Sequence, residues 1–261
     1  PVLCEAELAL YDIDAKRLEE SRIILDAINK NVNEGRAKIG TYLGVENRKE
    51  ALRGADFVVN AIQVGGYEPC TVTDFEIPKK YGLRQTIGDT VGIGGIFRAL
   101  RTIPVMLDFV RDMEKVCPEA LFLNYTNPMA ILTMAMCRAS FIQTVGICHS
   151  VQVCVPQLLY RLGLLQDHVK YKIAGINHMA WLLDIKDKDG NDLYPEIRRR
   201  AAEMNAAQKH DDMVRFEYIK HLGYYCTESS EHNAEYNPFF IKSKYPELIE
   251  KFNIPLDEYP R

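Results

Sequence analysis

The sequence predicts an α/β protein in which a doubly wound parallel sheet is followed by a mixed α+β domain. From about residue 5 to 162, short apolar runs alternate with segments of helical period, which is the pattern of repeated βαβ units. Several of these runs are apolar throughout, which is typical of strands buried on both faces of a parallel sheet. Past residue 165 the alternation stops. We therefore predict two domains, 1–164 and 165–261.

The elements of the first domain follow from apolar period and from helix start and stop signals. Asp14 is placed to cap the first helix, and Pro104 is expected to kink a long one. The expected strands are 7–14, 39–45, 55–62, one within 119–125, and 142–148. The expected helices are 15–32, 48–55, 95–116, 129–139 and 151–163, and 72–83 is expected to be a helix and a connection.

The second domain is expected to begin with two strands within 168–195, joined near Asp187–Gly190. Two helices with polar faces, 195–208 and 212–223, follow them. Residues 253–261 contain no obvious final packed element, and a glycine-rich loop would lie before Pro1. We therefore expect the chain to be truncated at both ends.

Composition narrows the class of protein. A net charge of −4 and a pI near 5.9 argue against nucleic acid and anionic membranes as partners. No apolar run approaches the roughly 20 residues of a membrane helix. The seven cysteines are an odd number without a CxxC pair, which favours reduced thiols and a cytoplasmic protein.

Asp12 ends the first predicted strand, where a Rossmann-like dinucleotide-binding domain places an acid that binds the adenosine ribose. Without the preceding glycine loop, a strand end followed by a helix cap is an equal alternative. The segment GDTVGIGGIF (88–97) does not follow a predicted strand and lacks the GxGxxG spacing. It is either a loop that lines a ligand site or a plain lead into a helix.

Other polar side chains follow the next strands. Asn127 precedes Pro128, so its backbone is kept out of the helical region and the Asn127–Pro128 bond is a candidate for cis. Its amide either binds a sugar or a nicotinamide ribose, or the turn only opens a helix. Cys148 and His178 together form a plausible incomplete metal site, the alternative being a core thiol and a core histidine. Glu228 and Glu231 could be taken for the carboxylate pair of an ordinary glycosidase, but they are too close in sequence to flank a glycosidic bond. The alternative for this segment is a solvated loop or helix cap.

The motifs together resemble glycoside hydrolase family 4, the NAD- and divalent-metal-dependent glycosidases. The resemblance spans residues 5 to 240 and is carried, in the expected order, by LYDID, VVNAIQVGG, GDTVGIGGIFRALRTIP, NYTNPM, GICHSVQ, GINHMAW and TESSEHNAEY. The segment CHSV is similar to the α-galactosidase (melibiase) branch. α-Glucosidase and α-glucuronidase or galacturonidase activities of the same family are alternatives.

The resemblance implies hydrolysis of α-galactosides such as melibiose by transfer of a hydride from C3 to NAD⁺, deprotonation at C2, elimination, addition of water and return of the hydride from NADH. It implies NAD and Mn²⁺ as cofactors and a homodimer or homotetramer. The ligands of the metal would be Cys148 and His178, and Tyr236, rather than Tyr224 or Tyr225, would be the base. The other implied site residues are Asp12, Asn60, Gly65 and Gly66 for the cofactor, Asn127 and Asn177 for the sugar, and His149 as an acid or a hydroxyl-binding group.

Two other classes of protein remain open on the sequence. A lactate- or malate-type NAD-dependent dehydrogenase shares the βαβ layout and the Asn-Pro turn, but it needs no Cys148 and His178 pair. A non-catalytic nucleotide-binding sensor needs no turnover at all. Dependence on a chelatable metal would separate the first from a glycosidase, and release of phenol from an aryl α-galactoside would separate the second.

Overall fold

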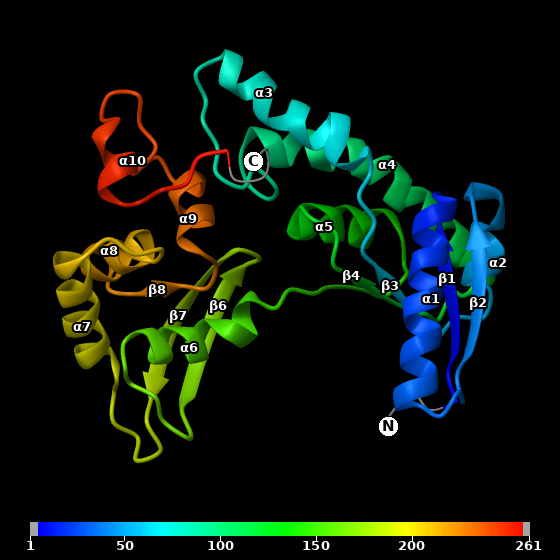
Figure 1. Ribbon diagram of the computed structural model, residues 1–261, viewed down its shortest axis with the longest axis horizontal. Coiled ribbons are helices and arrows are strands. Elements are labelled where there is room, and N and C mark those ends of the chain that lie inside the picture. Colours follow the sequence, from blue (N-terminus) through cyan, green and yellow to red (C-terminus); the bar gives the residue numbers. More distant parts are fainter. Residues whose placement is uncertain (1–4, 258–261) are drawn as a thin grey trace. The chain divides into compact units, whose positions relative to one another are not determined.

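The computed structural model describes residues 5–257, and its fold class is the predicted one, parallel strands with helices followed by an antiparallel sheet with helices (Figure 1). The first elements are β1 (Glu7–Asp12), α1 (Ala15–Val32), β2 (Lys38–Leu43), η1 (Val45–Asn47), α2 (Arg48–Leu52), β3 (Phe57–Asn60), η2 (Gly66–Thr71), α3 (Val72–Lys80), α4 (Ile93–Val116), β4 (Leu121–Asn124) and α5 (Met129–Ala139). They are followed by β5 (Thr144–Gly146), α6 (Ser150–Arg161), β6 (Lys170–Ile176), β7 (Met179–Lys186), α7 (Tyr194–Ala207), α8 (Met213–Leu222), β8 (Tyr225–Cys226), α9 (Ser230–Tyr236) and α10 (Glu247–Lys251).

The chain forms two compact units, each made of several segments. Among the described residues, unit 1 comprises 5–60, 103–124 and 133–145, and unit 2 comprises 61–102, 125–132 and 146–257. The predicted domain limits, 1–164 and 165–261, follow the chain rather than these units and stay a prediction. In the described part of the chain, no helix has both the length and the apolar character needed to cross a bilayer.

Unit 1 contains the parallel strands that the sequence predicts. Strand β1 pairs with β2, and β3 pairs with β4, both in parallel. The Asp14 side chain accepts a hydrogen bond from the Arg17 amide, as expected of a helix cap. One feature differs from the expectation of strands buried on both faces: Phe57 and Val59 of β3 are 67% and 65% exposed.

Unit 2 is built on the antiparallel sheet β6–β7–β8, which is visible in Figure 1. The predicted junction of its two strands near Asp187–Gly190 is wrong. Ile176 pairs with Met179, so Asn177 and His178 form a two-residue hairpin turn in the middle of the apolar run. The sequence GINHMAW has no Gly or Pro at the turn itself, which is why its hydrophobic pattern reads as continuous strand.

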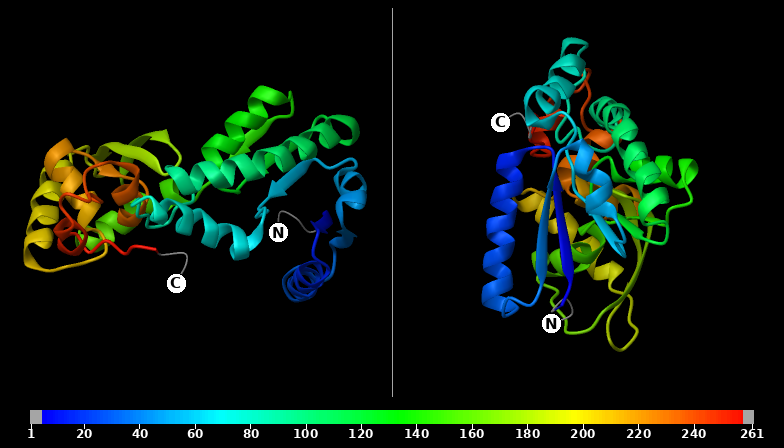
Figure 2. Two further views of the ribbon diagram at one scale, coloured as in Figure 1. Left: turned by 90° about the horizontal axis from the view of Figure 1, so that it is seen from above. Right: turned by 90° about the vertical axis from the view of Figure 1, so that its right-hand side faces the viewer.

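The core of unit 2 lies between this sheet and helices α6, α7 and α8. Its largest fully buried side chains include Leu158, Leu182, Ile197, Phe216 and Tyr225. Figure 2 shows α3 beside the first half of α4, where Arg101 donates to both carboxylate oxygens of Asp74 at 3.1 and 2.6 Å. Arg101 also donates to the carbonyl of Val64, so this ion pair fixes the loop that precedes η2.

Candidate active site

Cys148 lies two residues beyond the end of β5 and two residues before the first residue of α6. The backbone amide and the hydroxyl of Ser150, the first residue of α6, are both 3.4 Å from the Cys148 Sγ. The first amides of a helix lack acceptors within the helix, so this position favours an anion. The fold therefore places the thiol where a thiolate is stabilised.

His178 comes from the hairpin turn between β6 and β7, not from a strand as predicted. Its side chain is buried at 5% exposure, and its backbone has a φ of 61°. A residue other than glycine in this left-handed region costs roughly 1–2 kcal/mol, and such strain is often found at functional sites. The turn brings the imidazole to Cys148, with 3.4 Å between Nε2 and Sγ.

Glu228, from the loop before α9, completes a group of three potential ligands. Its Oε2 is 3.4 Å from the His178 Nε2, and the ligand atoms of Cys148, His178 and Glu228 all lie within 4.8 Å of one another. Burial raises the pKa of the Cys148 thiol, but hydrogen bonds from His178 and Ser150 outweigh it and lower this pKa to about 6. A thiolate, an imidazole and a carboxylate at these separations fit a divalent cation.

The other nitrogen of His178 faces a second polar group. Its Nδ1 is 2.7 Å from the Thr90 hydroxyl, which is also 2.7 Å from an Asp89 carboxylate oxygen. His232 Nε2 lies 3.6 Å from Asp89, and the ligand atoms of Asp89, His178 and His232 also lie within 4.8 Å of one another. Burial raises the pKa of Asp89, but interactions with His232 and Thr90 dominate and lower it overall.

Tyr236 lies on this Nδ1 side of His178, with its hydroxyl 3.5 Å from Nδ1. Burial and the charge of Asp89 raise the pKa of this phenol far above its usual value. The two other tyrosines considered lie elsewhere in unit 2. Tyr225 is fully buried and donates to Asp212 at 2.6 Å, and Tyr224 is 41% exposed and packs on Tyr194.

The loop that carries Asp89 and Thr90 is held from two sides. Glu235 of α9 accepts hydrogen bonds from the amides of Thr86, Ile87 and Gly88, at 2.6, 3.2 and 2.9 Å. On the other side, a Cβ added at Gly95 would come within 2.6 Å of the Thr90 carbonyl oxygen. The glycines of GDTVGIGGIF thus allow helix α4 to approach the loop closely.

The predicted sugar-binding residues have different surroundings. Both atoms of the Asn177 amide group are buried without a hydrogen-bond partner, which is costly unless a ligand satisfies them. Asn127, whose bond to Pro128 is cis, donates to Asp89 at 3.0 Å and accepts from the Met129 amide. His149 is exposed at the start of α6.

The predicted cofactor residues are divided between the units. In unit 1, Asp12 ends β1 and accepts two hydrogen bonds from Arg17, which lower its pKa. Asn60 is buried and donates to Asn124 at 2.9 Å. In unit 2, Gly65 and Gly66 have φ values of 86° and 65°, and a Cβ at Gly65 would come within 2.4 Å of the Cys70 Sγ.

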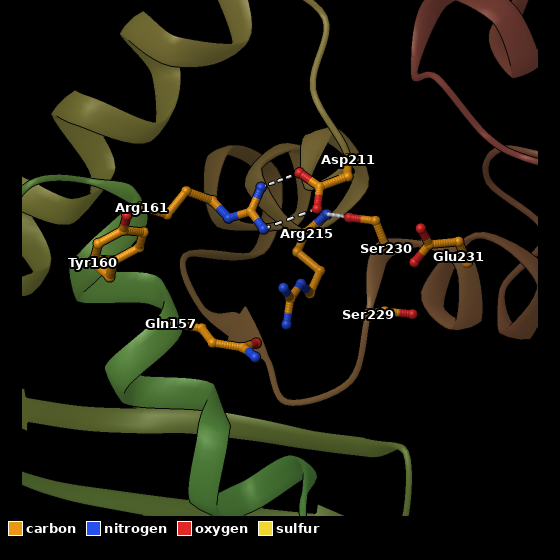
Figure 3. A pocket seen from close by; sticks show the side chains of 8 residues that line it. All are labelled: Gln157, Tyr160, Arg161, Asp211, Arg215, Ser229, Ser230 and Glu231. Atoms are coloured by element: carbon orange, nitrogen blue, oxygen red, sulfur yellow. Dashed lines mark hydrogen bonds and ion pairs between the residues drawn. The ribbon is translucent and has the colours of Figure 1, made fainter.

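A separate pocket of about 440 Å³ lies in unit 2 and is drawn in Figure 3. It is lined by Gln157, Tyr160, Arg161, Asp211, Arg215, Ser229, Ser230 and Glu231, and it contains none of the residues that the motifs single out as metal ligands or base. Arg161 is paired with Asp211, and Arg215 is paired with Asp212. The two guanidinium groups are already neutralised, so the pocket is a poor anion site.

The structure brings together Cys148, His178 and Tyr236 as the sequence predicts, and it adds Asp89, Thr90 and Glu228. Asp89 and Thr90 stand in a glycine-rich segment in which the glycines alone suggest a ligand site from the sequence. Glu228 is too close to Glu231 in sequence for the carboxylate pair of an ordinary glycosidase, so the sequence favours a solvated loop or helix cap there. The signal in the sequence that could have indicated Asp89 and Thr90 is a polar Asp-Thr pair within a loop flanked by glycines.

Comparison with known proteins agrees with the resemblance that the motifs carry. Residues 1–164 match the family 4 glycosyl hydrolases, and residues 173–261 match the family 4 glycosyl hydrolase C-terminal domain. An α-galactosidase of Bacillus subtilis (strain 168) is 63% identical over 255 residues, which are 98% of this chain and 58% of that protein. The chain thus spans less than two thirds of the length of this relative.

Two solved structures share the fold. The crystal structure of lplD from Bacillus subtilis has a TM-score of 0.78 at 26% identity, covering 97% of this chain and 60% of that one. A 6-phospho-α-glucosidase from gut microorganisms, solved in complex with NAD and Mn²⁺, has a TM-score of 0.70 at 22% identity, covering 95% and 60%. Together the matched motifs, the two matched domains and the close relative confirm the family prediction: the chain belongs to glycoside hydrolase family 4.

Proposed function

We propose that this protein is an α-galactosidase that depends on NAD and a divalent metal, expected to be Mn²⁺, and acts by redox-assisted elimination. The observation that carries the proposal is that Cys148 and Tyr236 lie on either side of the His178 imidazole. The Cys148 Sγ is 3.4 Å from Nε2, and the Tyr236 hydroxyl is 3.5 Å from Nδ1. The 63% identity to an α-galactosidase supports the choice of substrate. The complex of a family relative with NAD and Mn²⁺ supports the cofactors.

In this proposal, Cys148 and His178 hold the cation, and Asp12 binds the adenosine ribose. When bound, the metal would supply Lewis acidity toward the sugar hydroxyls, and NAD⁺ would accept a hydride from C3 of the sugar and return it after water has added. Asn60, Gly65 and Gly66 are the other residues proposed to bind the cofactor. Because the Asp12 carboxylate binds Arg17 in this structure, ribose hydroxyls would share or replace those contacts.

Tyr236 is proposed to remove the C2 proton. A phenol whose pKa is raised by burial and by Asp89 is a poor base until positive charge is added nearby. Since Tyr236 and the proposed ligand Cys148 contact the two nitrogens of the same imidazole, its basicity would depend on the metal. Asn177 and Asn127 would bind sugar hydroxyls, and the buried unsatisfied amide of Asn177 supports its part. His149 would act as acid or hydroxyl-binding group.

The test is turnover of matched aryl α-galactoside and α-glucoside substrates by the 261-residue protein with NAD⁺ and Mn²⁺. We expect release of phenol from the galactoside, loss of activity with a chelator and recovery with Mn²⁺. Deuterium at C2 should slow the reaction or exchange with solvent, as direct displacement would not require. Faster hydrolysis of the glucoside would replace the substrate, and turnover that is unaffected by chelation would overturn the mechanism.

Variants separate the proposed roles. We expect Cys148→Ser to abolish metal-dependent activity and Tyr236→Phe to abolish exchange at C2, with Tyr224→Phe as a matched control of ordinary activity. A lactate- or malate-type dehydrogenase would instead oxidise a hydroxy acid without the metal pair, and the matches to two glycosyl hydrolase domains favour the glycosidase. A cytoplasmic homodimer or homotetramer is part of the proposal, and light scattering tests the assembly.

A further inference from the structure

The proposed metal site has a chemical difficulty if Cys148 and His178 are its sole protein ligands. A thiolate and an imidazole are the ligands that Zn²⁺ favours, whereas Mn²⁺ favours carboxylate and other oxygen ligands. A ligand set for Mn²⁺ therefore needs oxygen from the protein or from the sugar. In the described part of unit 2, a carboxylate oxygen already lies beside this pair, on Glu228.

Glu228 is held with one oxygen anchored and the other directed at the site. Its Oε1 accepts a hydrogen bond from the Ser229 amide at 3.0 Å, and its Oε2 lies 3.4 Å from the His178 Nε2. The Cys148 Sγ is at the same 3.4 Å from that nitrogen. Ligand atoms that share one ion at bond lengths of about 2.0–2.3 Å must lie roughly this far apart.

The hydrogen bonds around His178 decide which of its nitrogens is available. The Thr90 hydroxyl is 2.7 Å from both Asp89 Oδ1 and His178 Nδ1. An ionised carboxylate only accepts hydrogen bonds, so the single hydroxyl proton goes to Asp89 and Nδ1–H must donate to the Thr90 oxygen. In the neutral imidazole the lone pair is then on Nε2, which faces Cys148 and Glu228.

The same reasoning separates the two candidate clusters. The cluster of Asp89, His178 and His232 lies on the side where Nδ1 carries a proton, and its Asp89 carboxylate already accepts hydrogen bonds from Thr90 and Asn127. The cluster of Cys148, His178 and Glu228 offers a lone pair together with two groups that carry negative charge as a thiolate and a carboxylate. The second cluster therefore fits a divalent cation better than the first does.

We propose that Glu228 is the third protein ligand of the divalent cation, and that Thr90 and Asp89 are positioning residues that keep the His178 Nε2 lone pair directed at it. This inference rests on the proposed function, since it concerns the same cation. It assigns to Glu228 the preference for Mn²⁺ over Zn²⁺. Mutation of a residue that is hydrogen-bonded to a metal-binding histidine commonly lowers metal affinity about 10–100-fold, and we expect an effect of this size for Thr90.

The test measures binding of Mn²⁺ alone to the 261-residue protein by electron paramagnetic resonance, with Zn²⁺ binding measured by competition. We expect Glu228→Gln to weaken Mn²⁺ binding at least about tenfold, which is the lower end of the range given above for residues that support a metal ligand. Zn²⁺ binding should weaken less. Glu228→Asp, which keeps the charge, should lose less affinity than Glu228→Gln. Glu231→Gln is the matched control, because Glu231 lies three residues away and lines the separate pocket. The affinity of this variant for Mn²⁺ should equal that of the wild type.

The positioning role has its own readout. Thr90→Val should weaken Mn²⁺ binding about 10–100-fold, and Thr90→Ser, which restores the hydroxyl, should recover it. Nitrogen-15 shifts of the His178 ring, recorded in the metal-free protein at a pH where the imidazole is neutral, should move from the Nδ1–H tautomer in Thr90→Val and return in Thr90→Ser. A serine variant that binds as weakly as the valine variant would overturn this part of the inference.

The outcomes distinguish this inference from the function on which it rests. If Cys148→Ser loses Mn²⁺ while Glu228→Gln binds it as the wild type does, Glu228 is not a ligand and the proposed function stands. If the wild type itself binds no Mn²⁺, the metal site fails and both fall. Urea unfolding followed by Trp181 fluorescence identifies any variant of unit 2 that is misfolded, since this is the sole tryptophan of the sequence.

Discussion

Replacing Asp212 with Asn should strongly destabilise unit 2, because Asp212 neutralises a buried arginine. The carboxylate of Asp212 and the guanidinium of Arg215 are 1% and 6% exposed, and they form an ion pair. The same carboxylate accepts hydrogen bonds from Tyr225 at 2.6 Å and Ser230 at 3.0 Å. The Asn variant keeps the shape of the side chain but leaves the Arg215 charge without its counterion.

The magnitude follows from burial. Breaking a buried pair by removing one partner typically costs about 3–5 kcal/mol, because an uncompensated charge remains inside the protein. The neighbouring Asp211 provides a matched control, since it pairs with Arg161 while its own side chain is 66% exposed. Exposed pairs typically contribute about 0.2–1 kcal/mol, so Asp211→Asn should change stability by no more than that.

The assay is urea unfolding followed by the fluorescence of Trp181, which lies in unit 2 and packs on Tyr218 with ring centroids 5.7 Å apart. It reports the free energy of unfolding of the unit that contains the substitution. Replacing both charges, as in Asp212→Asn with Arg215→Met, should recover part of the loss because the unpaired charge is then gone. A loss below about 1 kcal/mol for Asp212→Asn, or no recovery in the double variant, would refute the reasoning.

Three further predictions concern the candidate site. Since the folded pKa of Cys148 is lowered to about 6 and an unfolded thiol titrates near about 8.5, the thiolate's contribution to stability is present above the higher value and is lost as pH falls through the lower one. Alkylation of Cys148 by iodoacetamide in metal-free protein should therefore be half-maximal near pH 6, and one unit or more higher in urea; equal midpoints would contradict the shift. Gly95→Ala should destabilise unit 2 by about 1–3 kcal/mol in the Trp181 assay, because its Cβ would meet the Thr90 carbonyl oxygen at 2.6 Å; an unchanged midpoint would show that the loop yields. Glu235→Gln should speed hydrogen exchange at the amides of residues 86–88 by about tenfold or more, since hydrogen bonds to a charged acceptor contribute about 1.5–3 kcal/mol; unchanged exchange would remove this carboxylate as their anchor.

Much of the fold could be predicted because the period of apolar residues is a local property. The predicted helix 129–139 is observed as Met129–Ala139, and the strand predicted at 55–62 contains β3 at Phe57–Asn60. The hairpin turn at Asn177–His178 could not be found in this way. A left-handed residue is usually marked by glycine, whereas here the turn uses a histidine whose tertiary contacts offset the strain.

The candidate site could be predicted in part, and the division has a physical cause. Cys148 and His178 stood out because reactive side chains interrupt apolar runs. Asp89, Thr90 and Glu228 lie in polar loops, where such residues are common and local sequence gives no contrast. Their proximity to His178 depends on contacts far apart in sequence, such as Thr90 to His178 and Glu235 to Thr86.

The same long-range contacts connect stability to the site. Ser230 follows Glu228 by two residues, and its hydroxyl both accepts a hydrogen bond from the Arg215 amide and donates one to Asp212. The buried ion pair of Asp212 and Arg215 therefore anchors the loop from which Glu228 reaches His178. Asp212→Asn should consequently weaken Mn²⁺ binding at urea concentrations where unit 2 is still folded, although Asp212 itself is no ligand. Asp211→Asn should leave that affinity unchanged. If Asp212→Asn lowers stability but not affinity, Glu228 is positioned by its own hydrogen bond to the Ser229 amide, independently of the ion pair.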